Sequence, residues 1–219
     1  MGALLVEWQL LLLKLSEGML VSVEIFTLTL LFSLPLGLFV SFGRMSKNPL
    51  LRNVVKIYIS IMRGTPLMLQ LMVVYFGPFY IFKMSTPDRF VAVIIGFVLN
   101  YAAYFAEIYR AGIESMPVGQ YEAAKVLGYS KTQTFLKIIL PQVIKRILPP
   151  VTNEVITLVK DTSLAFVISV SEMFTLAKAI ASAQRSVAPY IAAGIFYYVF
   201  NFIVAYVMEW VEKKFSYFR

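Results

Sequence analysis

The sequence predicts an all-α integral membrane protein with five transmembrane helices. Hydrophobic residues make up 59% of the chain and the mean hydropathy is +0.76, whereas soluble domains are roughly 45–50% apolar. The apolar residues come in runs long enough to cross a bilayer. The basic residues lie in short segments between these runs, so the net charge of +8 indicates loops at a membrane surface rather than a nucleic-acid-binding domain.

The sequence lacks several residue types, and their absence excludes several kinds of site and of catalysis. It contains no cysteine and no histidine, which excludes disulfides, Cys/His metal sites and histidine acid–base catalysis. It also has no G-x-x-x-x-G-K-[ST] motif for cradling ATP phosphates. We therefore expect no metal, no cofactor and no catalytic residue in this chain. If ATP drives transport, ATP and Mg²⁺ are expected on a partner protein.

The N-terminal residues 1–16 differ from the segments that follow. Their leucines are interrupted by Glu7, Trp8 and Lys14, and the stretch is too short to span a membrane. It lacks a basic start and a small-residue cleavage site, so it does not resemble a signal peptide. We expect an interfacial helix with Trp8 at headgroup level, followed by a transmembrane domain over residues 17–219.

Five apolar segments define the expected spans, with a break inside the second. Pro35 is expected to kink the first span. In the second, Thr65 as N-cap and Pro66 at the first helical position would begin a new helix. Residues 171–188 are expected to form a loop. The spans are expected at about residues 18–42, 55–82, 90–113, 151–170 and 189–210.

The distribution of basic residues predicts the orientation. Most of the 20 Lys and Arg residues fall in one alternate set of connections, which by the positive-inside rule is cytoplasmic. The N-terminus is then outside and the C-terminus inside. This set consists of Arg44, Lys47, Arg52, Lys56, Arg110, Lys125, Lys131, Lys137, Lys145, Arg146, Lys213, Lys214 and Arg219.

A polar segment at about residues 114–148 predicts a helix–turn–helix elbow on the cytoplasmic side. Residues 120–127 are typical of a short helix, and Gly128 stands where a helix end needs a left-handed residue. Ser130 can cap a second short helix. Ala123 and Ala124 are expected to form a small contact face that another protein can approach closely.

The spacing in this segment resembles the cytoplasmic loop of importer-type ABC transporter permeases. Glu122-Ala123-Ala124 is followed by Gly128 and then by I-x-L-P at residues 138–141. The resemblance implies a type I importer permease fold in which Glu122, Ala123, Ala124 and Gly128 couple to a separate ATPase. It also implies a cell-membrane complex of two permeases, identical or closely related, with two ATPase subunits and an extracytoplasmic solute-binding protein.

Further motifs are similar to the polar amino-acid branch of these permeases, the subunits of histidine, arginine/lysine, glutamine and glutamate importers. They are Arg63-Gly64-Thr65-Pro66 with Gln70, Glu107-x-x-Arg110-x-Gly112, Pro117-x-Gly119-Gln120-x-Glu122, and Lys160-Asp161-Thr162-Ser163-Leu164.

Polar residues inside the expected spans are candidates for substrate binding, because charges at membrane depth need a partner or a water-filled cavity. Glu154 and Asp161 are two helical turns apart and share one face. They suit an ammonium group, while free N–H groups at the broken helix suit a carboxylate. Alternatively, the two acids neutralise Arg63 and Lys160 within a structural network. The candidate substrate-binding residues are Glu154, Asp161, Ser163, Asn100, Thr65 and Gln70.

The acids favour a basic amino acid, namely arginine, lysine or histidine, as the substrate. A glutamine or glutamate importer is the alternative, since every α-amino acid carries an ammonium group. A secondary transporter that uses Glu154 and Asp161 as an ion relay is a further alternative, but it leaves the charged elbow without a role.

Overall fold

The structure, a computed structural model, describes the backbone of residues 2–215 and the side chains of residues 8–215. Within these limits it consists of helices and connecting turns and contains no strand. Arg219, one of the bases used for the orientation, lies outside the described residues. The helices are α1 (Gly2–Arg44), α2 (Pro49–Gly64), α3 (Leu67–Phe82), α4 (Arg89–Glu114), α5 (Val118–Val126), α6 (Lys131–Thr134), a π-helical turn (Phe135–Ile139), α7 (Leu140–Asp161), a 3-10 helix (Thr162–Ile168), α8 (Met173–Gln184) and α9 (Ala188–Lys214).

The helices provide the predicted five spans. Three of them, α1, α4 and α9, are long and apolar enough to cross a membrane unaided. Two bent pairs supply the others: α2 and α3 meet at 112°, and the helix over residues 131–168 meets α8 at 59°. Counting each bent pair as one broken span gives up to five crossings by length and composition.

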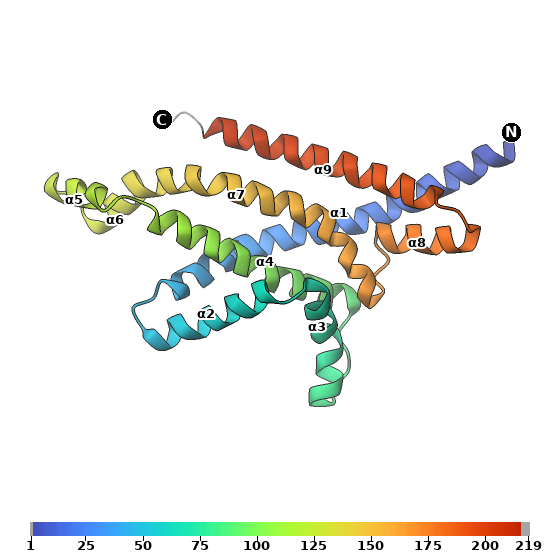
Figure 1. Ribbon diagram of the computed structural model, residues 1–219, viewed down its shortest axis with the longest axis horizontal. Coiled ribbons are helices and arrows are strands. Elements are labelled where there is room, and N and C mark those ends of the chain that lie inside the picture. The colour runs from blue at the N-terminus through green and yellow to red at the C-terminus, as the bar shows by residue number, and fades with distance from the viewer. Residues whose placement is uncertain (1, 216–219) are drawn as a thin grey trace.

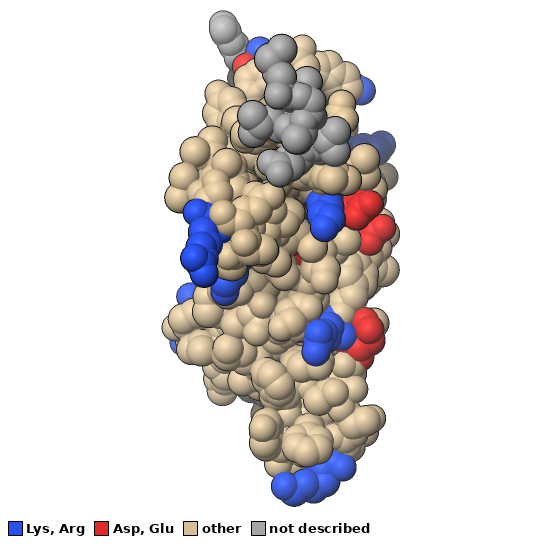
Figure 2. All heavy atoms as spheres, turned by 90° about the vertical axis from the view of Figure 1, so that its right-hand side faces the viewer, with Lys and Arg blue, Asp and Glu red and all other residues tan. Residues whose placement is uncertain are grey.

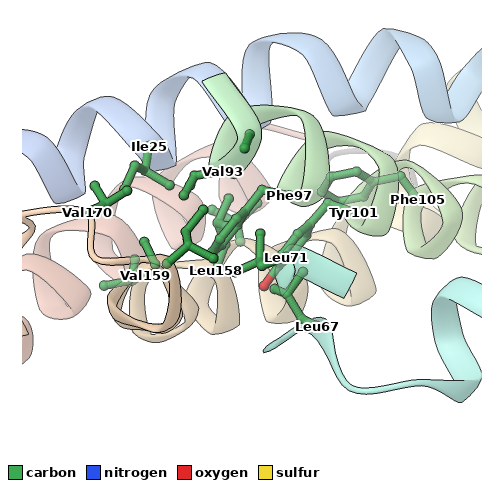
Figure 3. Close-up of a cluster of buried hydrophobic side chains, with 14 of the residues drawn as sticks. Ile25, Leu67, Leu71, Val93, Phe97, Tyr101, Phe105, Leu158, Val159 and Val170 are labelled. Atoms are coloured by element: carbon green, nitrogen blue, oxygen red, sulfur yellow. The ribbon is translucent and has the colours of Figure 1, made fainter. Parts of the chain in front are cut away.

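Helix α4 forms the centre of the fold. Its Phe97, Tyr101 and Phe105 are fully buried and pack among Ile25 of α1, Leu71 of α3 and Leu158 of α7 (Figure 3). Large apolar side chains on the outer faces of α1, α3 and α9 are exposed instead. A bundle with an apolar core and apolar outer faces is what a lipid environment requires.

The two ends of the bundle differ in the segments that they carry. The elbow of α5 and α6, the α1–α2 turn and the C-terminal end of α9 lie at one end, and the N-terminus and the α8–α9 turn lie at the other (Figure 1). Viewed from the N-terminal end, the surface is mostly uncharged, with separate small groups of basic and acidic side chains (Figure 2). This arrangement agrees with the predicted orientation, in which the base-rich connections face the cytoplasm.

Helix α1 shows no boundary between the expected interfacial segment and the first span. It is continuous from Gly2 to Arg44 and contains Pro35. Leu11 and Leu15 are buried in a cluster with Met173 and Ala177 of α8. An interfacial position of residues 1–16, of which residue 1 is outside the described part, stays a prediction.

The segment over residues 171–188 is not the expected loop. It contains α8, whose N-cap Glu172 accepts hydrogen bonds from the backbone N–H groups of Phe174 (2.6 Å) and Thr175 (2.8 Å). Glu172 is fully buried, and Tyr197 of α9 donates to it at 3.2 Å. A carboxylate that caps a helix from inside the protein therefore holds α8 against α9.

The fourth span begins earlier than expected. Pro149 and Pro150, taken from the sequence as the end of the elbow, lie inside α7. A proline removes one backbone hydrogen bond and bends a helix, but packing against neighbouring helices keeps the helix continuous. The elbow therefore leads into the membrane through one helical segment, residues 131–168.

Candidate functional site

The break between α2 and α3 is closed by polar side chains. Pro66 is the N-cap of α3, so the prediction of Thr65 in this role was wrong; Thr65 ends α2 instead. Its hydroxyl donates to the Ile61 carbonyl at 2.8 Å, which a residue at a helix C-terminus can reach. The same hydroxyl accepts a hydrogen bond from Gln70 Nε2 at 2.8 Å.

Gln70 and Asn100 complete this group. Gln70 Nε2 also donates to the carbonyls of Met62 (3.0 Å) and Thr65 (3.1 Å), and Asn100 Nδ2 donates to Gln70 Oε1 (2.9 Å) and Met62 O (3.0 Å). Both side chains are buried. They satisfy carbonyls that the break releases from the helical ladder. The structure thus brings these three candidates together, with their hydrogen bonds directed at one another and at the backbone.

The amide groups at the start of α3 are partly occupied as well. The N–H groups of Leu69 and Gln70 donate to the Pro66 carbonyl at 3.0 and 3.3 Å. A carboxylate would therefore have to bind through the amides of Leu67 and Met68, which come first in α3.

The two acids of the fourth span lie farther along the core. Asp161 accepts a hydrogen bond from the Tyr101 hydroxyl of α4 at 2.8 Å. Glu154 is half-buried and lines an open cavity of about 470 Å³, together with Arg63 and Tyr104. Ser163, also a candidate, uses its hydroxyl to donate to the Lys160 carbonyl at 2.8 Å.

Glu107 on α4 pairs with three arginines, and two of them, Arg63 and Arg110, line the same cavity. It lies 2.7 Å from Arg110, 3.5 Å from Arg44 of α1 and 4.0 Å from Arg63 of α2. Arg110 also pairs with Glu114. This centre is not evident from the sequence as a whole, although the spacing of Glu107 and Arg110, one helical turn apart, indicates the first pair.

Bases lie near both candidate acids without forming a close ion pair with them in the described part of the chain. Among the described residues, no ion pair involves Glu154 or Asp161, and Lys160 is exposed. The acid paired with Arg63 is Glu107, and Arg63 also lies over the Tyr104 ring, 5.3 Å from its centroid. The ion pair of Arg63 is thus made with Glu107 of α4, while Glu154 lines the same cavity as Arg63 and Arg146 without an ion pair to any described residue within 4.0 Å.

The turn of the elbow has the predicted geometry. Gly128 has a φ of +79°, and the amides of Gly128 and Tyr129 donate back to the carbonyls of Lys125 and Ala124, as in a Schellman motif. Ser130 then caps α6 through a capping box with Gln133. Local residue chemistry was sufficient to predict this turn.

The exposed face of α5 differs from the expected one. Ala124 is only 1% exposed because it packs on the inner side of α5, so the prediction that it forms an outer contact face was wrong. Glu122, Ala123 and Gly128 are exposed as expected. Two apolar side chains beyond the predicted contact residues, Val126 and Leu127, are 87% and 73% exposed.

Known proteins share this architecture. Residues 33–217 match the family described as "Binding-protein-dependent transport system inner membrane component". The chain is 37% identical over 204 residues to the L-cystine transport system permease protein TcyB of Bacillus subtilis (strain 168), covering 91% of this chain and 86% of that protein. It is 36% identical over 199 residues to the arginine transport system permease protein ArtQ of the same organism, covering 90% of each.

A solved structure agrees with these relatives. The crystal structure of an amino acid ABC transporter with histidines matches with a TM-score of 0.85 and 31% identity over 96% of both chains. The fold is that of a type I ABC importer permease, and such a permease works with an ATPase and a binding protein. The chain therefore belongs to the family of binding-protein-dependent inner membrane components and is the membrane permease subunit of an amino-acid ABC importer.

Proposed function

We propose that this permease carries amino acids with a cationic side chain, such as arginine, lysine or histidine, past Glu154 and Asp161. The observation that carries the proposal is that Glu107, and not the two candidate acids, makes the ion pairs near the cavity. Glu107 gathers Arg44, Arg63 and Arg110, while Glu154 and Asp161 have no ion-pair partner among the described residues.

A carboxylate inside a membrane protein favours a positive partner, because desolvation without a counter-charge is unfavourable. An arginine or lysine substrate brings two positive groups, its α-ammonium and its side chain, and can engage both acids at once. Glutamine brings only the α-ammonium. Asp161 is held in a fixed position by the Tyr101 hydroxyl, so part of the site is organised before substrate arrives.

The names of the relatives support the substrate class to different degrees. ArtQ is named for arginine and the matched structure contains histidines, whereas TcyB is named for cystine. The preference for a cationic substrate therefore rests on the acids. Glutamine and glutamate remain the alternative substrates, and they are included in the test below.

We further infer that α5 docks on the partner ATPase, which would hold ATP and Mg²⁺. Exposed Val126 and Leu127 give the elbow an apolar surface outside the bilayer, and such surfaces are typical of protein contacts. Glu122, Ala123 and Gly128 border it. We expect a homodimer of this chain with two ATPase subunits and a solute-binding protein on the outer side.

The decisive test is substrate binding to the purified permease–ATPase complex without the solute-binding protein, because that protein has its own specificity. Calorimetric titrations with arginine, lysine, histidine, glutamine and glutamate should show stronger binding of the cationic amino acids. Glu154→Gln should weaken arginine binding roughly tenfold to a hundredfold, the range for a lost hydrogen bond to a charged group. Glu24→Gln, the same change at an exposed position on α1, is the matched control. Stronger binding of glutamine than of arginine would reverse the assignment.

A further inference from the structure

The helix that joins the elbow to the substrate acids contains a weak point. Residues 135–139 form a π-helical turn, in which the Leu140 N–H bonds to the Phe135 carbonyl. Pro141 follows directly and has no N–H to donate to the carbonyl of residue 137. A π turn inside a helix is a common place for the helix to kink. A displacement of the elbow is therefore expected to bend the helix between residues 135 and 141 instead of moving α7.

Two glutamines connect the elbow to α7 beyond this weak point. Gln120 Nε2 donates to Gln142 Oε1 at 2.9 Å, and Gln142 Nε2 donates back to Gln120 Oε1 at 2.7 Å. Gln142 Nε2 also donates to the Ile138 carbonyl, inside the π turn, at 2.7 Å. Gln120 lies in the first turn of α5 and Gln142 in the first turn of α7. The amide pair thus links α5 to α7 without passing through the intervening chain.

Beyond the amide pair, α7 is fixed to α4. Arg146 Nη1 donates to the Ser115 carbonyl at the end of α4, at 2.8 Å. Gly112 lies so close to α7 that a Cβ there would be 2.2 Å from Ile147 Cγ2. Val143, next to Gln142, is buried in a cluster with Ile139 and Met116. The cytoplasmic ends of α4 and α7 therefore form one packed unit.

We propose that the Gln120–Gln142 amide pair is a positioning element that transmits displacement of α5 to α7 past the π turn. Two parallel hydrogen bonds fix both the distance and the relative rotation of the helices, which one bond does not. Helix α7 carries Glu154 and Asp161, so the displacement reaches the substrate acids. The proposal rests on the proposed docking of α5 on the ATPase.

The test uses the assembled transporter in vesicles. Gln120→Met and Gln142→Met keep side-chain length and remove the hydrogen bonds, and the double variant removes the pair together. Gln184→Met, at the exposed end of α8, is the matched control. The measurements are co-purification of the ATPase, unfolding temperature, arginine uptake and ATP hydrolysed per substrate transported.

Each single variant should assemble normally and take up arginine about tenfold more slowly, the scale expected from losing one or two hydrogen bonds. ATP hydrolysis should continue, so that the ATP used per substrate rises. The double variant should be no worse than Gln142→Met, because the two side chains act through each other. Normal ATP use per substrate in the single variants, or additive losses in the double variant, would overturn the proposal.

A variant on the exposed face of α5 distinguishes the amide-pair proposal from the proposal that α5 docks on the ATPase. Leu127→Asp places a charge on the exposed face of α5 and should abolish coupling through that face. If it transports normally, the docking assignment fails and the amide-pair proposal fails with it. If it uncouples while the glutamine variants transport normally, only the amide-pair proposal is overturned. Should Gln142→Met fail to assemble, Gln120→Met decides, because it leaves the bond to Ile138 in place.

Discussion

Replacing Glu107 by glutamine should destabilise the transporter, whereas the same change at Glu154 should leave its stability unchanged and weaken substrate binding. The two acids line the same cavity and undergo the same chemical change. They differ in their partners, because Glu107 lies within 4.0 Å of three arginines and Glu154 has no ion pair within the described residues.

The expected loss of stability depends on whether each substitution leaves a buried base without its partner. Removing one partner of a buried ion pair costs about 3–5 kcal/mol. Glu107 is 16% exposed, but Arg63 is 45% exposed and Arg110 keeps Glu114, so we expect about 2–3 kcal/mol for Glu107→Gln after allowing for solvent screening. Glu154→Gln strands no base and should stay within about 0.5 kcal/mol of the parent.

The assay is thermal unfolding of the purified complex in one detergent at one heating rate, because unfolding of such complexes is often irreversible. At about 2–4 °C per kcal/mol for chains of this length, Glu107→Gln should lower the midpoint by roughly 4–12 °C. Arginine binding to the folded fraction is measured in parallel. If Glu154→Gln lowers the midpoint as much as Glu107→Gln while binding is unaffected, Glu154 is a structural residue and the proposed substrate contact is wrong.

Three further changes test the packing and the turns. Gly112→Ala should lower the unfolding midpoint by an amount equivalent to about 1–3 kcal/mol, because its methyl group meets Ile147, whereas Gly119→Ala, with open space around it, should not. Gly128→Val should uncouple uptake from ATP hydrolysis, since its φ of +79° suits asparagine but not a β-branched residue; Gly128→Asn should therefore transport normally. Glu172→Ala should destabilise by about 1–2 kcal/mol, measured by the same thermal unfolding, through loss of a buried helix cap.

Features that depend on local chemistry were predictable from the sequence. The spans follow from runs of apolar residues, because a bilayer of fixed thickness requires a minimum length. The elbow turn follows from Gly128 and Ser130, since each residue has the conformational or hydrogen-bonding property that its position needs. These inferences involve residues within a few positions of one another.

Features that depend on packing between helices were not predictable in this way. Helix α8 is short, and its cap is a glutamate, which is not among the commonest N-cap residues. The burial of Ala124 depends on how α5 folds back on its neighbours, and a run of small residues does not say which of them faces inward. The continuity of α7 through Pro149 and Pro150 likewise depends on the helices beside it.

The charges of the cavity show the same distinction and decide what the site can bind. The spacing of Glu154 and Asp161 places them on one helical face, but it does not say which bases they meet. Arg44 and Arg63 come from α1 and α2, and only the packing of these helices on α4 brings them to Glu107. That pairing leaves Glu154 and Asp161 without an ion pair among the described residues, although Arg63 and Arg146 line the cavity together with Glu154. A second positive group on the substrate can then make the close ion pair with these acids that the described residues do not make, and this is the physical basis for expecting a cationic amino acid.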